Sequence, residues 1–294
     1  MTDETETAFY EGERRAQALA GVEPPSSAFI RAFMTEQHRN FFAALPYVVL
    51  GALSADGWPV ATLAVGSPGF LSSPDETTLL LAWAPPRDDP VAEAIGPGRP
   101  AAILGIEFAT RRRNRANGVV LSSGPDGILL HVLQSFGNCP QYIRTRDMWP
   151  VHRVPGCVER LSVLDAEARG LIGTATTFFV ASCASEVALG GMDVSHRGGP
   201  SGFVRIDGDV LTVPDYPGNR YFNSFGNFLE NPRGGLLFVD FSTGDLLHVA
   251  GDASVSWIGT QRSFSLRIRD VLRRRAALPL AWGEGPDVQA PKNR

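Results

Sequence analysis

The chain has 294 residues, a formal net charge of −4, and a composition that is 44% hydrophobic and 20% charged. These values are typical of a globular protein with a sizeable core, and they exclude a disordered chain. The acidic balance provides no general attraction to nucleic acid or to anionic membranes, so neither is an expected partner. No run approaches the roughly 18 apolar residues of a membrane-spanning helix.

The cysteines and the first residues bear on the cellular location. The three cysteines are odd in number and far apart, at Cys139, Cys157 and Cys183. This spacing favours neither a disulfide framework nor a zinc cluster. The first residues are acidic and polar, unlike a secretory signal. We therefore expect a cytoplasmic protein that binds no metal.

An N-terminal helical segment is expected over residues 1–40. Ser26 and Ser27 precede an apolar pattern, which includes Phe29 and Phe42, that suits a helix packed on a core. Short β-type runs follow, and the turn at 55–57 links the first two of them. These runs lie at 47–53, 59–65, 77–83 and 101–108.

The second half of the chain has a similar order of elements. A second helix is expected at 165–172, and another set of strands begins at 176. Few segments have the length of the helices that cross over between parallel strands. Many short strands with Gly/Pro turns favour antiparallel barrels.

An internal repeat relates the two halves at a separation of 133 residues. Two β-rich segments of similar composition would give one match by chance, but four matches in one register favour a duplicated barrel. The matches pair Gly69-Phe70 with Gly202-Phe203, 102–108 with 235–241, Arg87 with Arg220, and Gly118 with Gly251.

The two copies differ in their polar residues. The stretch 190–203 combines a carboxylate, a hydroxyl, an imidazole and a guanidinium with flexible glycines. The first copy has Leu63 and Ala64 where the second has an imidazole and a guanidinium. A guanidinium fork beside hydroxyl and glycine amides is suitable chemistry for a phosphate. The candidate residues are Asp193, Ser195, His196, Arg197 and Gly198.

A second polar cluster follows between residues 214 and 227. A strand is expected to end at Val213 and a helix to begin around Arg220. Amide donors at a helix start favour an anion, whereas the alternative interpretation is a polar loop with an Asx turn and a helix cap. The side-chain donors of this cluster are Asn219, Arg220, Ser224 and Asn227.

At these residues the sequence resembles the pyridoxamine 5′-phosphate oxidase-like, FMN-binding split-barrel superfamily. The resemblance rests on 193–204, 214–220, Ser224, Asn227, Asn231-Pro232 and 235–238. The segments 109–118 and 134–142 resemble the tandem branch, which has two barrels in one chain. The resemblance covers residues 29–282 and specifies the cofactor better than the reaction.

The resemblance implies a mainly β (α+β) fold, with two tandem antiparallel split β-barrels, each six-stranded, and short flanking helices. It implies a first half at 41–150, a second half at 151–282 that carries the FMN phosphate site, and a flexible tail at 283–294. FMN would lie in a groove between two barrels, usually across a dimer interface, so a homodimer is expected. Arg197 and Arg220 would hold the phosphate, and Ser195, Asn219 and Ser224 would assist.

Several residues have two interpretations at this stage. The run 111–115 is either a basic lip over the groove or a solvated turn after a strand. Cys139 is either a redox thiol near the flavin or a buried, inert residue. His196 is either a haem ligand or proton donor, or a hydrogen-bonding member of the cofactor loop. The remaining assignments are structural for His131, His152 and His248, and a solvated strand end for 273–275.

Two main functions compete. The first is an FMN-dependent oxidoreductase that acts on an unidentified small molecule, with a diffusible electron donor such as NAD(P)H. No GxGxxG follows a strand, so no resident dinucleotide site is expected. The second is a non-catalytic flavin- or haem-binding carrier or sensor, and a scaffold that has lost its cofactor is a weaker alternative. No residue pair is placed to recognise pyridoxamine phosphate, and other branches of the superfamily bind haem or a deazaflavin.

Overall fold

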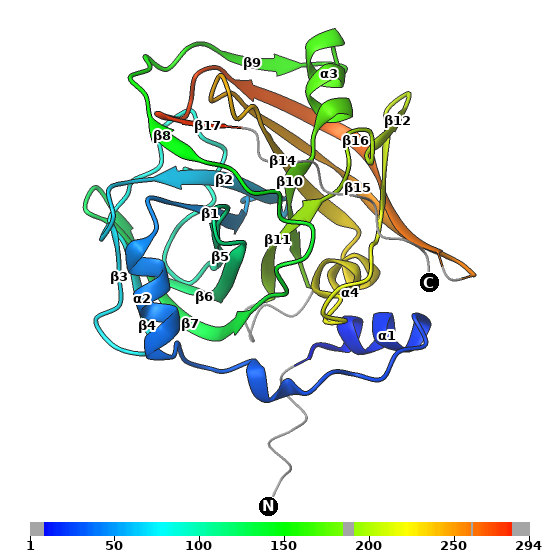
Figure 1. Ribbon diagram of the computed structural model, residues 1–294, viewed down its shortest axis with the longest axis horizontal. Helices are drawn as coiled ribbons and strands as arrows, with labels where there is room; N and C mark the ends of the chain where they lie inside the picture. The colour runs from blue at the N-terminus through cyan, green and yellow to red at the C-terminus, as the bar shows by residue number, and fades with distance from the viewer. Residues whose placement is uncertain (1–8, 185–190, 260, 284–294) are drawn as a thin grey trace, which may run out of the picture.

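The computed structural model describes residues 9–184, 191–259 and 261–283. Within these ranges the chain is mainly β, with two large antiparallel sheets and four short α-helices, which confirms the predicted fold class. The two halves lie beside each other in Figure 1. None of the helices in these ranges combines the length and apolar character needed to cross a membrane. All but the first residue of the predicted flexible tail lies outside the described residues.

Each half forms one sheet in which seven strands are hydrogen-bonded in a single continuous order. The first sheet contains β1 (Tyr47–Leu53), β2 (Pro59–Val65), β3 (Leu71–Ser72), β4 (Thr78–Leu81), β5 (Pro100–Glu107), β6 (Arg112–Gly124) and β7 (Gly127–Gly137). The second contains β10 (Thr177–Cys183), β11 (Met192–Gly198), β12 (Arg205–Asp207), β13 (Val210–Pro214), β14 (Arg233–Val239), β15 (Leu246–Ile258) and β16 (Gln261–Arg274). The helices are α1 (Glu11–Leu19), α2 (Glu36–Ala44), α3 (Ala166–Thr174) and α4 (Asn223–Glu230), with a 3-10 turn η1 (Ser27–Phe29).

The two sheets have the same strand order. The first runs β2-β1-β5-β6-β7-β4-β3 and the second β11-β10-β14-β15-β16-β13-β12, so the strands correspond one for one. An added strand, β9 (Val158–Leu161), pairs with β16, and β8 (Met148–Pro150) pairs with β17 (Leu280–Trp282) in a small separate sheet. The shared order is what a duplicated barrel requires.

The repeat also extends to local geometry. The register of both long hairpins shifts at a glycine, at Gly118 in β6 and at Gly251 in β15. A Cβ at Gly118 would lie 1.8 Å from the carbonyl oxygen of His131, and one at Gly251 would lie 2.2 Å from that of Arg267. Only glycine permits such a close approach of two backbones at a bulge. The match of these two glycines in the sequence therefore has a physical cause.

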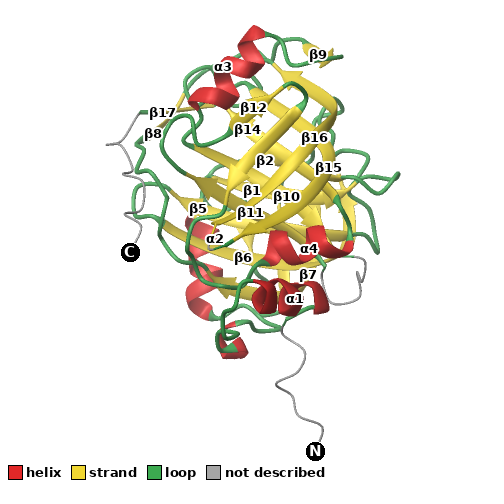
Figure 2. Ribbon diagram, turned by 90° about the vertical axis from the view of Figure 1, so that its right-hand side faces the viewer, coloured by secondary structure: helices red, strands yellow, loops and turns green. Residues whose placement is uncertain are grey.

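A third core holds the two barrels together. Val48 of β1 points into the first barrel, while Val49 packs between the barrels. In β10, Phe178 points into the second barrel and Phe179 packs between the barrels. Burial on both faces explains why β1 and β10 read as continuous apolar runs without alternation. Figure 2 shows the strands of both halves side by side, with α1 and α4 packed together below them.

The N-terminal segment is less helical than the sequence predicts. Residues 27–29 form only a 3-10 turn, and the side chain of Phe29 is 60% exposed. The chain then pairs with β7, because the backbone of Arg31 exchanges both hydrogen bonds with Ser135. Helix α2 begins only after Thr35, whose hydroxyl accepts from the amide of His38. Pairing with a barrel strand thus overrides the helical pattern before residue 35. By contrast, Asp165 caps α3 as the helix predicted at 165–172 requires.

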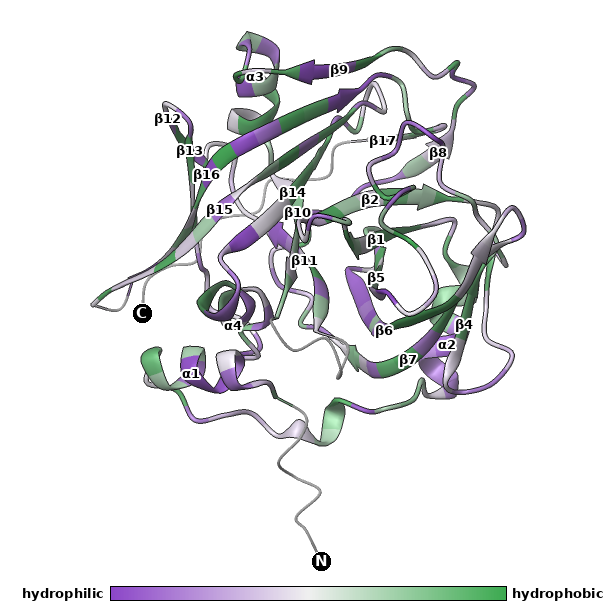
Figure 3. Cartoon of the chain, turned by 180° about the vertical axis from the view of Figure 1, so that it is seen from behind, coloured by the Kyte–Doolittle hydropathy of each residue, from purple (hydrophilic) through white to green (hydrophobic). Residues whose placement is uncertain are grey.

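The prediction of a solvated strand end at 273–275 is wrong. The side chain of Arg273 is 5% exposed and pairs with Glu159, Asp165 and Glu167. Arg275 binds carboxylates of the same group. These ion pairs join the end of β16 to β9 and α3, and Figure 3 shows hydrophilic stretches at β9 and at the adjacent end of β16. Arg273 and Arg275 are thus held in ion pairs at the strand end and are not free in solvent.

Arg274 points in the opposite direction, into a buried ion pair with Asp89 of the first half at 2.6 Å. Removal of one member leaves an uncompensated buried charge. We therefore expect Asp89→Ala to lower the free energy of unfolding by about 3–5 kcal/mol. Asp270→Ala, which removes an exposed partner of Arg160, is the control and should cost less than about 1 kcal/mol. Urea denaturation measures both values, and equal losses would contradict the prediction.

Candidate functional site

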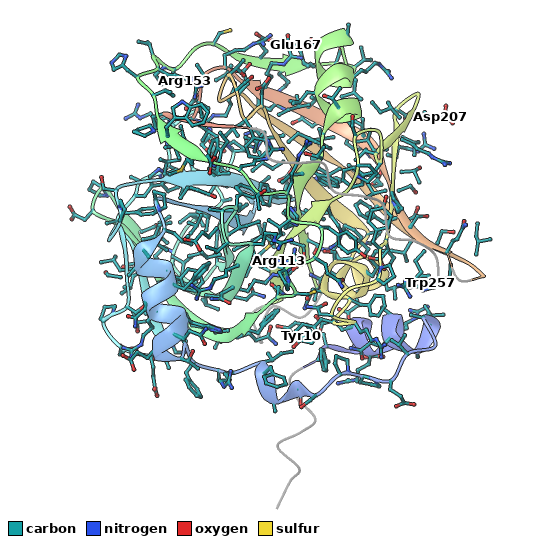
Figure 4. The ribbon with its side chains drawn as sticks, viewed as in Figure 1. Tyr10, Arg113, Arg153, Glu167, Asp207 and Trp257 are labelled. Carbon is teal, nitrogen blue, oxygen red and sulfur yellow. The ribbon has the colours of Figure 1, made fainter. Side chains whose placement is uncertain are left out.

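A cavity of about 380 Å³ lies between the two halves. Both barrels contribute to its wall, and five arginines line it. Figure 4 places one of these, Arg113, near the centre of the molecule. The volume is in the range of small-molecule and cofactor pockets. The arginines are Arg113 and Arg115 of β6, Arg197 of β11, Arg220 of the loop before α4, and Arg262 of β16.

Strand β11 forms one wall and is the edge strand of the second sheet. On the side of β11 that has no neighbouring strand, the backbone receives a hydrogen bond from the other barrel. Arg115 Nε donates to the carbonyl oxygen of Val194 at 3.0 Å. The remaining nitrogens of Arg115 bind Ser195 Oγ at 2.7 Å, Asp193 Oδ1 at 3.1 Å and Asn223 Oδ1 at 2.8 Å. All these groups are buried or half-buried, so the charge of Arg115 is compensated inside the protein.

Asp193 and Asn227, both predicted to bind the cofactor, lie behind the cavity wall. Asp193 pairs with Arg115 and accepts a hydrogen bond from Ser195 Oγ at 2.8 Å. Asn227 donates to Ser182 Oγ at 3.0 Å and to the carbonyl oxygen of Gly191. Neither side chain is among those that line the cavity. Their hydrogen bonds and the ion pair hold the wall in place.

The other seven predicted residues line the cavity: Ser195, His196, Arg197, Gly198, Asn219, Arg220 and Ser224.

Three of these seven carry buried polar atoms without a partner. Arg197 Nε, Ser224 Oγ and His196 Nε2 are all enclosed and have no hydrogen-bond partner in the structure. No described carboxylate lies within ion-pair distance of Arg197, a half-buried residue whose pKa is lowered by burial, an effect that Asp215 opposes. An unpaired guanidinium with an enclosed nitrogen is costly unless a bound group supplies the negative charge. The cavity therefore suits an anion.

The loop before α4 presents Arg220 to the same end. Arg220 is exposed, and both it and Phe222 adopt the left-handed backbone conformation, with φ of 63° and 59°. The helix begins at Asn223, three residues later than the sequence predicts. Asn219 Oδ1 accepts from the amide of Tyr221 at 3.2 Å, which is the Asx turn of the alternative interpretation. The loop is thus both a structured turn and part of the cavity wall.

At another part of the wall Arg113 contacts His196. Arg113 Nε donates to the carbonyl oxygen of Cys139 at 2.9 Å, and its Nη1 lies 3.1 Å from His196 Nδ1. Burial, with Arg115 and Arg197 nearby, lowers the pKa of Arg113 to about 9, so it remains charged at neutral pH. Burial and the adjacent guanidiniums hold the pKa of His196 well below its ordinary value, so the imidazole is neutral.

The tautomer of His196 follows from this contact. A guanidinium can only donate, so Nδ1 of His196 accepts and its Nε2 carries the proton. That Nε2–H is buried and has no partner in the structure.

Sequence reasoning did not assign Arg113 and Arg115 individually. The run 111–115 was expected in a turn, but the turn covers residues 108–111 and β6 begins at Arg112. Alternation along a strand then directs Arg113 and Arg115 to one face and Arg112 to the other, where its guanidinium lies over the Phe41 ring. The basic run was the available signal, and the start of the strand was the missing information. No pattern in the sequence marks Arg262, which pairs with Asp215 at 2.9 Å.

The position related to the cavity by the repeat is filled. His196 and Arg197 correspond to Leu63 and Ala64 of β2, as the 133-residue shift predicts, because Val65 and Gly198 occupy equivalent pairing positions. The same shift relates Arg115 to His248, and the two side chains make equivalent contacts. His248 Nδ1 bonds the carbonyl oxygen of Ala61 at 3.0 Å, as Arg115 Nε bonds that of Val194. In place of a cavity, Thr62 and Arg274 both donate to Asp89. Only one of the two equivalent positions is lined by unpaired arginines.

Helix α1 packs behind the loop and the helix α4 that line the site. It crosses α4 so closely that a Cβ at Gly12 would lie 2.3 Å from the carbonyl oxygen of Gly226. Gln17 Nε2 donates to the carbonyl oxygen of Arg220 at 3.2 Å. Glu13, which is 2% exposed, accepts from the amide of Tyr10 at 3.0 Å and from Asn223 Nδ2 at 2.5 Å. The N-terminal helix therefore supports both the loop and the first residue of α4.

The described residues contain no group of three or more histidine, cysteine or carboxylate side chains arranged to hold a metal. All three cysteines are free. Cys139 is half-buried beside the cavity, and its carbonyl oxygen, not its thiol, makes the contact with Arg113.

Comparisons with known proteins give matches to solved structures alone, since no family model and no curated protein matches the chain. An FAD-binding protein from Mesorhizobium loti is 13% identical, with a TM-score of 0.30, over 40% of this chain and 97% of that one. A protein of the pyridoxinephosphate oxidase family from Clostridium acetobutylicum is 11% identical, with a TM-score of 0.29, over 40% and 92%. The haem-storage protein HutZ from Vibrio cholerae is 12% identical, with a TM-score of 0.27, over 37% and 93%. The matches thus include the group that the sequence motifs resemble.

The ionisation of Glu13 provides a test of how α1 is held against the site. Burial raises the pKa of Glu13 from 4.5 to about 8, although hydrogen bonds from Tyr10 and Asn223 oppose the shift. Between these two values the unfolded chain loses this proton and the folded chain keeps it, so stability falls as pH rises from 4.5 to 8. Glu13→Gln removes this titrating group, so its contribution to the pH dependence of stability is lost.

We expect the Tm of the wild type to fall by roughly 5 °C more than that of Glu13→Gln between pH 5 and pH 8.5. Thermal unfolding followed by circular dichroism measures this difference. Glu11→Gln alters an exposed carboxylate of the same helix and is the matched control. Identical pH profiles for Glu13→Gln and the wild type would show that Glu13 ionises normally.

Proposed function

We propose that this protein binds FMN in the cavity between its two barrels and acts as an FMN-dependent oxidoreductase. The observation that carries the proposal is the pair of orphaned polar atoms, Arg197 Nε and Ser224 Oγ, beside the unpaired Arg220. A phosphate would satisfy all three groups with charge-assisted hydrogen bonds. Tyr216 and Tyr142, whose ring centroids lie 5.2 Å apart with an interplanar angle of 32°, supply an aromatic wall at the same cavity. A cofactor with a phosphate and a flat ring fits this set of groups.

When bound, FMN would supply the electron transfer, since the cofactor carries that chemistry. The chain's own residues would bind and orient it. Arg197, Arg220, Ser224 and Asn219 would hold the phosphate, while Arg115 would fix the wall formed by β11. The donor tautomer of His196 would provide a neutral N–H toward an acceptor. A diffusible reductant such as NAD(P)H would deliver the electrons to a small-molecule substrate.

Haem is a less suitable occupant. A ring nitrogen of histidine binds iron through its lone pair. In His196 the lone pair of Nδ1 already accepts from Arg113, and Nε2 carries the proton. The other described histidines do not line the cavity. With this hydrogen bond in place, the one histidine among the lining residues offers no free lone pair to iron.

A non-catalytic flavin carrier or sensor is the second candidate. One observation favours it: the one carboxylate that lines the cavity, Asp215, is paired with Arg262, so no free general acid or base of that kind is present. The cavity draws on both barrels of a single chain, so it needs no second copy. The homodimer that the family resemblance implies is an independent prediction, which gel filtration with light scattering would test.

We predict that the protein binds one FMN per chain. Arg197→Ala and Arg220→Ala should each weaken FMN binding by about 10- to 100-fold, because each removes a charge-assisted hydrogen bond. Fluorescence titration of the unloaded protein with FMN measures the affinity. Arg87→Ala, the repeat equivalent of Arg220 in the first half, is exposed and does not line the cavity, so it should bind FMN normally. Binding of two flavins per chain, or equal loss in Arg87→Ala, would contradict this assignment.

The oxidoreductase and the carrier differ in one measurement. An oxidoreductase should show bleaching of the flavin absorption band when NADH or NADPH is added without oxygen, and the band should return when oxygen is admitted. A carrier should keep its oxidised spectrum with either donor. Riboflavin and a deazaflavin, tested under the same conditions, determine which cofactor the cavity accepts.

A further inference from the structure

The charge of the cavity exceeds what one cofactor phosphate neutralises. Five guanidiniums line it, and two of them are paired, Arg115 with Asp193 and Arg262 with Asp215. No described carboxylate lies within ion-pair distance of Arg113, Arg197 or Arg220. A phosphate monoester carries about 1.5 to 2 negative charges at neutral pH. One of the three unpaired guanidiniums therefore lacks a counter-charge when the cofactor is bound.

Position identifies Arg113 as that residue. Arg197 and Arg220 belong to the second half, as does Ser224 with its orphaned hydroxyl, whereas Arg113 comes from β6 of the first half. Its guanidinium is fixed at two points, by the carbonyl oxygen of Cys139 and by His196 Nδ1. Among the described residues, none accepts a hydrogen bond from its Nη2 group. Because Nε and Nη1 are held in place, the guanidinium of Arg113 is fixed in the cavity wall, and its Nη2 is available to a ligand.

His196 makes the same place selective for an acceptor. Its side chain is 3% exposed, and its buried Nε2–H has no partner in the structure. Arg113 and His196 thus offer only N–H donors beyond the hydrogen bond that joins them. A neutral hydroxyl would leave the guanidinium charge unpaired, whereas an oxyanion would satisfy both residues.

We propose that Arg113 and His196 form a second anion subsite, which binds a carboxylate or phosphate group of the molecule that reacts with the cofactor. The proposal rests on the proposed function, since it concerns the same cavity with FMN in place. The subsite selects substrates by charge: anionic small molecules bind, and their neutral amides or alcohols are rejected. Arg113 comes from the first barrel and His196 from the second, so the anionic group of the substrate lies between the two halves.

The test uses the FMN-loaded protein, in which the first subsite is occupied. Inorganic phosphate and acetate are titrated separately while the flavin absorption spectrum and the heat of binding are recorded. The wild type should bind at least one of the two anions with saturation, and the preferred anion indicates the charged group of the substrate. Arg113→Gln should weaken that binding at least tenfold while its FMN content is unchanged.

Two variants sharpen the test. Arg113→Lys keeps the charge but loses the fork, so its affinity should fall between those of the wild type and Arg113→Gln. Arg112→Gln removes a neighbouring arginine that is exposed on the opposite face of β6, and it should bind the anion as the wild type does. Saturable binding that is unchanged in Arg113→Gln, or no binding of either anion to the loaded wild type, would overturn the proposal.

Failure of the proposed function is distinguishable. If FMN does not bind, phosphate is titrated into the unloaded protein by calorimetry. Two binding sites are then expected, one lost in Arg113→Gln and the other in Arg197→Gln. A single site that depends only on Arg197 would overturn the second subsite even in the absence of FMN.

Discussion

The site depends on one interaction between the barrels, in which Arg115 of β6 hydrogen-bonds the edge strand β11 of the other barrel. Strand β11 ends its sheet, so on that side its backbone has no neighbouring strand. The guanidinium takes the place of one by donating to the carbonyl oxygen of Val194. Burial of its charge is tolerated because Asp193 and Ser195 surround it. Through Asn223 the same group reaches α4 and then Glu13 of α1. One side chain thus links both barrels and two helices around the cavity.

The same constraint explains how the two halves diverged. His248 caps the edge of β2 at the position where Arg115 caps β11. At the first position the surrounding residues are apolar or form the closed set of Thr62, Asp89 and Arg274. At the second, arginines without partners face an open space. A capped edge is required at both places for the barrels to pack, while an open cavity is required at only one.

Much of the fold was accessible from the sequence because its causes are local. The apolar runs of β1 and β10, the turn near Gly57 and the cap at Asp165 each act within a few residues. The repeat was visible because glycines such as Gly118 and Gly251 are required by close backbone contacts. A phosphate site was predicted at Arg197, Arg220 and Ser224 because guanidinium and hydroxyl groups are suitable donors to a phosphate. They do meet at one cavity, although the ligand itself remains a proposal.

The errors arose where long-range contacts decide. The helix expected before residue 35 is displaced by pairing with Ser135, more than a hundred residues away. The arginines at 273–275 are buried because β9 and α3, from elsewhere in the chain, provide carboxylates. In both cases the local sequence pattern was interpreted correctly, but the residues that decide the outcome lie elsewhere in the chain.

The crossing of α1 and α4 at Gly12 and Gly226 has a consequence for the order in which the protein is assembled during synthesis. Chains emerge from the ribosome N-terminus first, and domains tend to fold as they appear. The first barrel can close its own core early, but α1 precedes it and has to wait for a helix made more than two hundred residues later. The cavity wall is complete only when Arg262 has been made. A ligand of this cavity would therefore be held only after Arg262 has been made, and a nascent chain that stalls between the two barrels would expose its inter-barrel face.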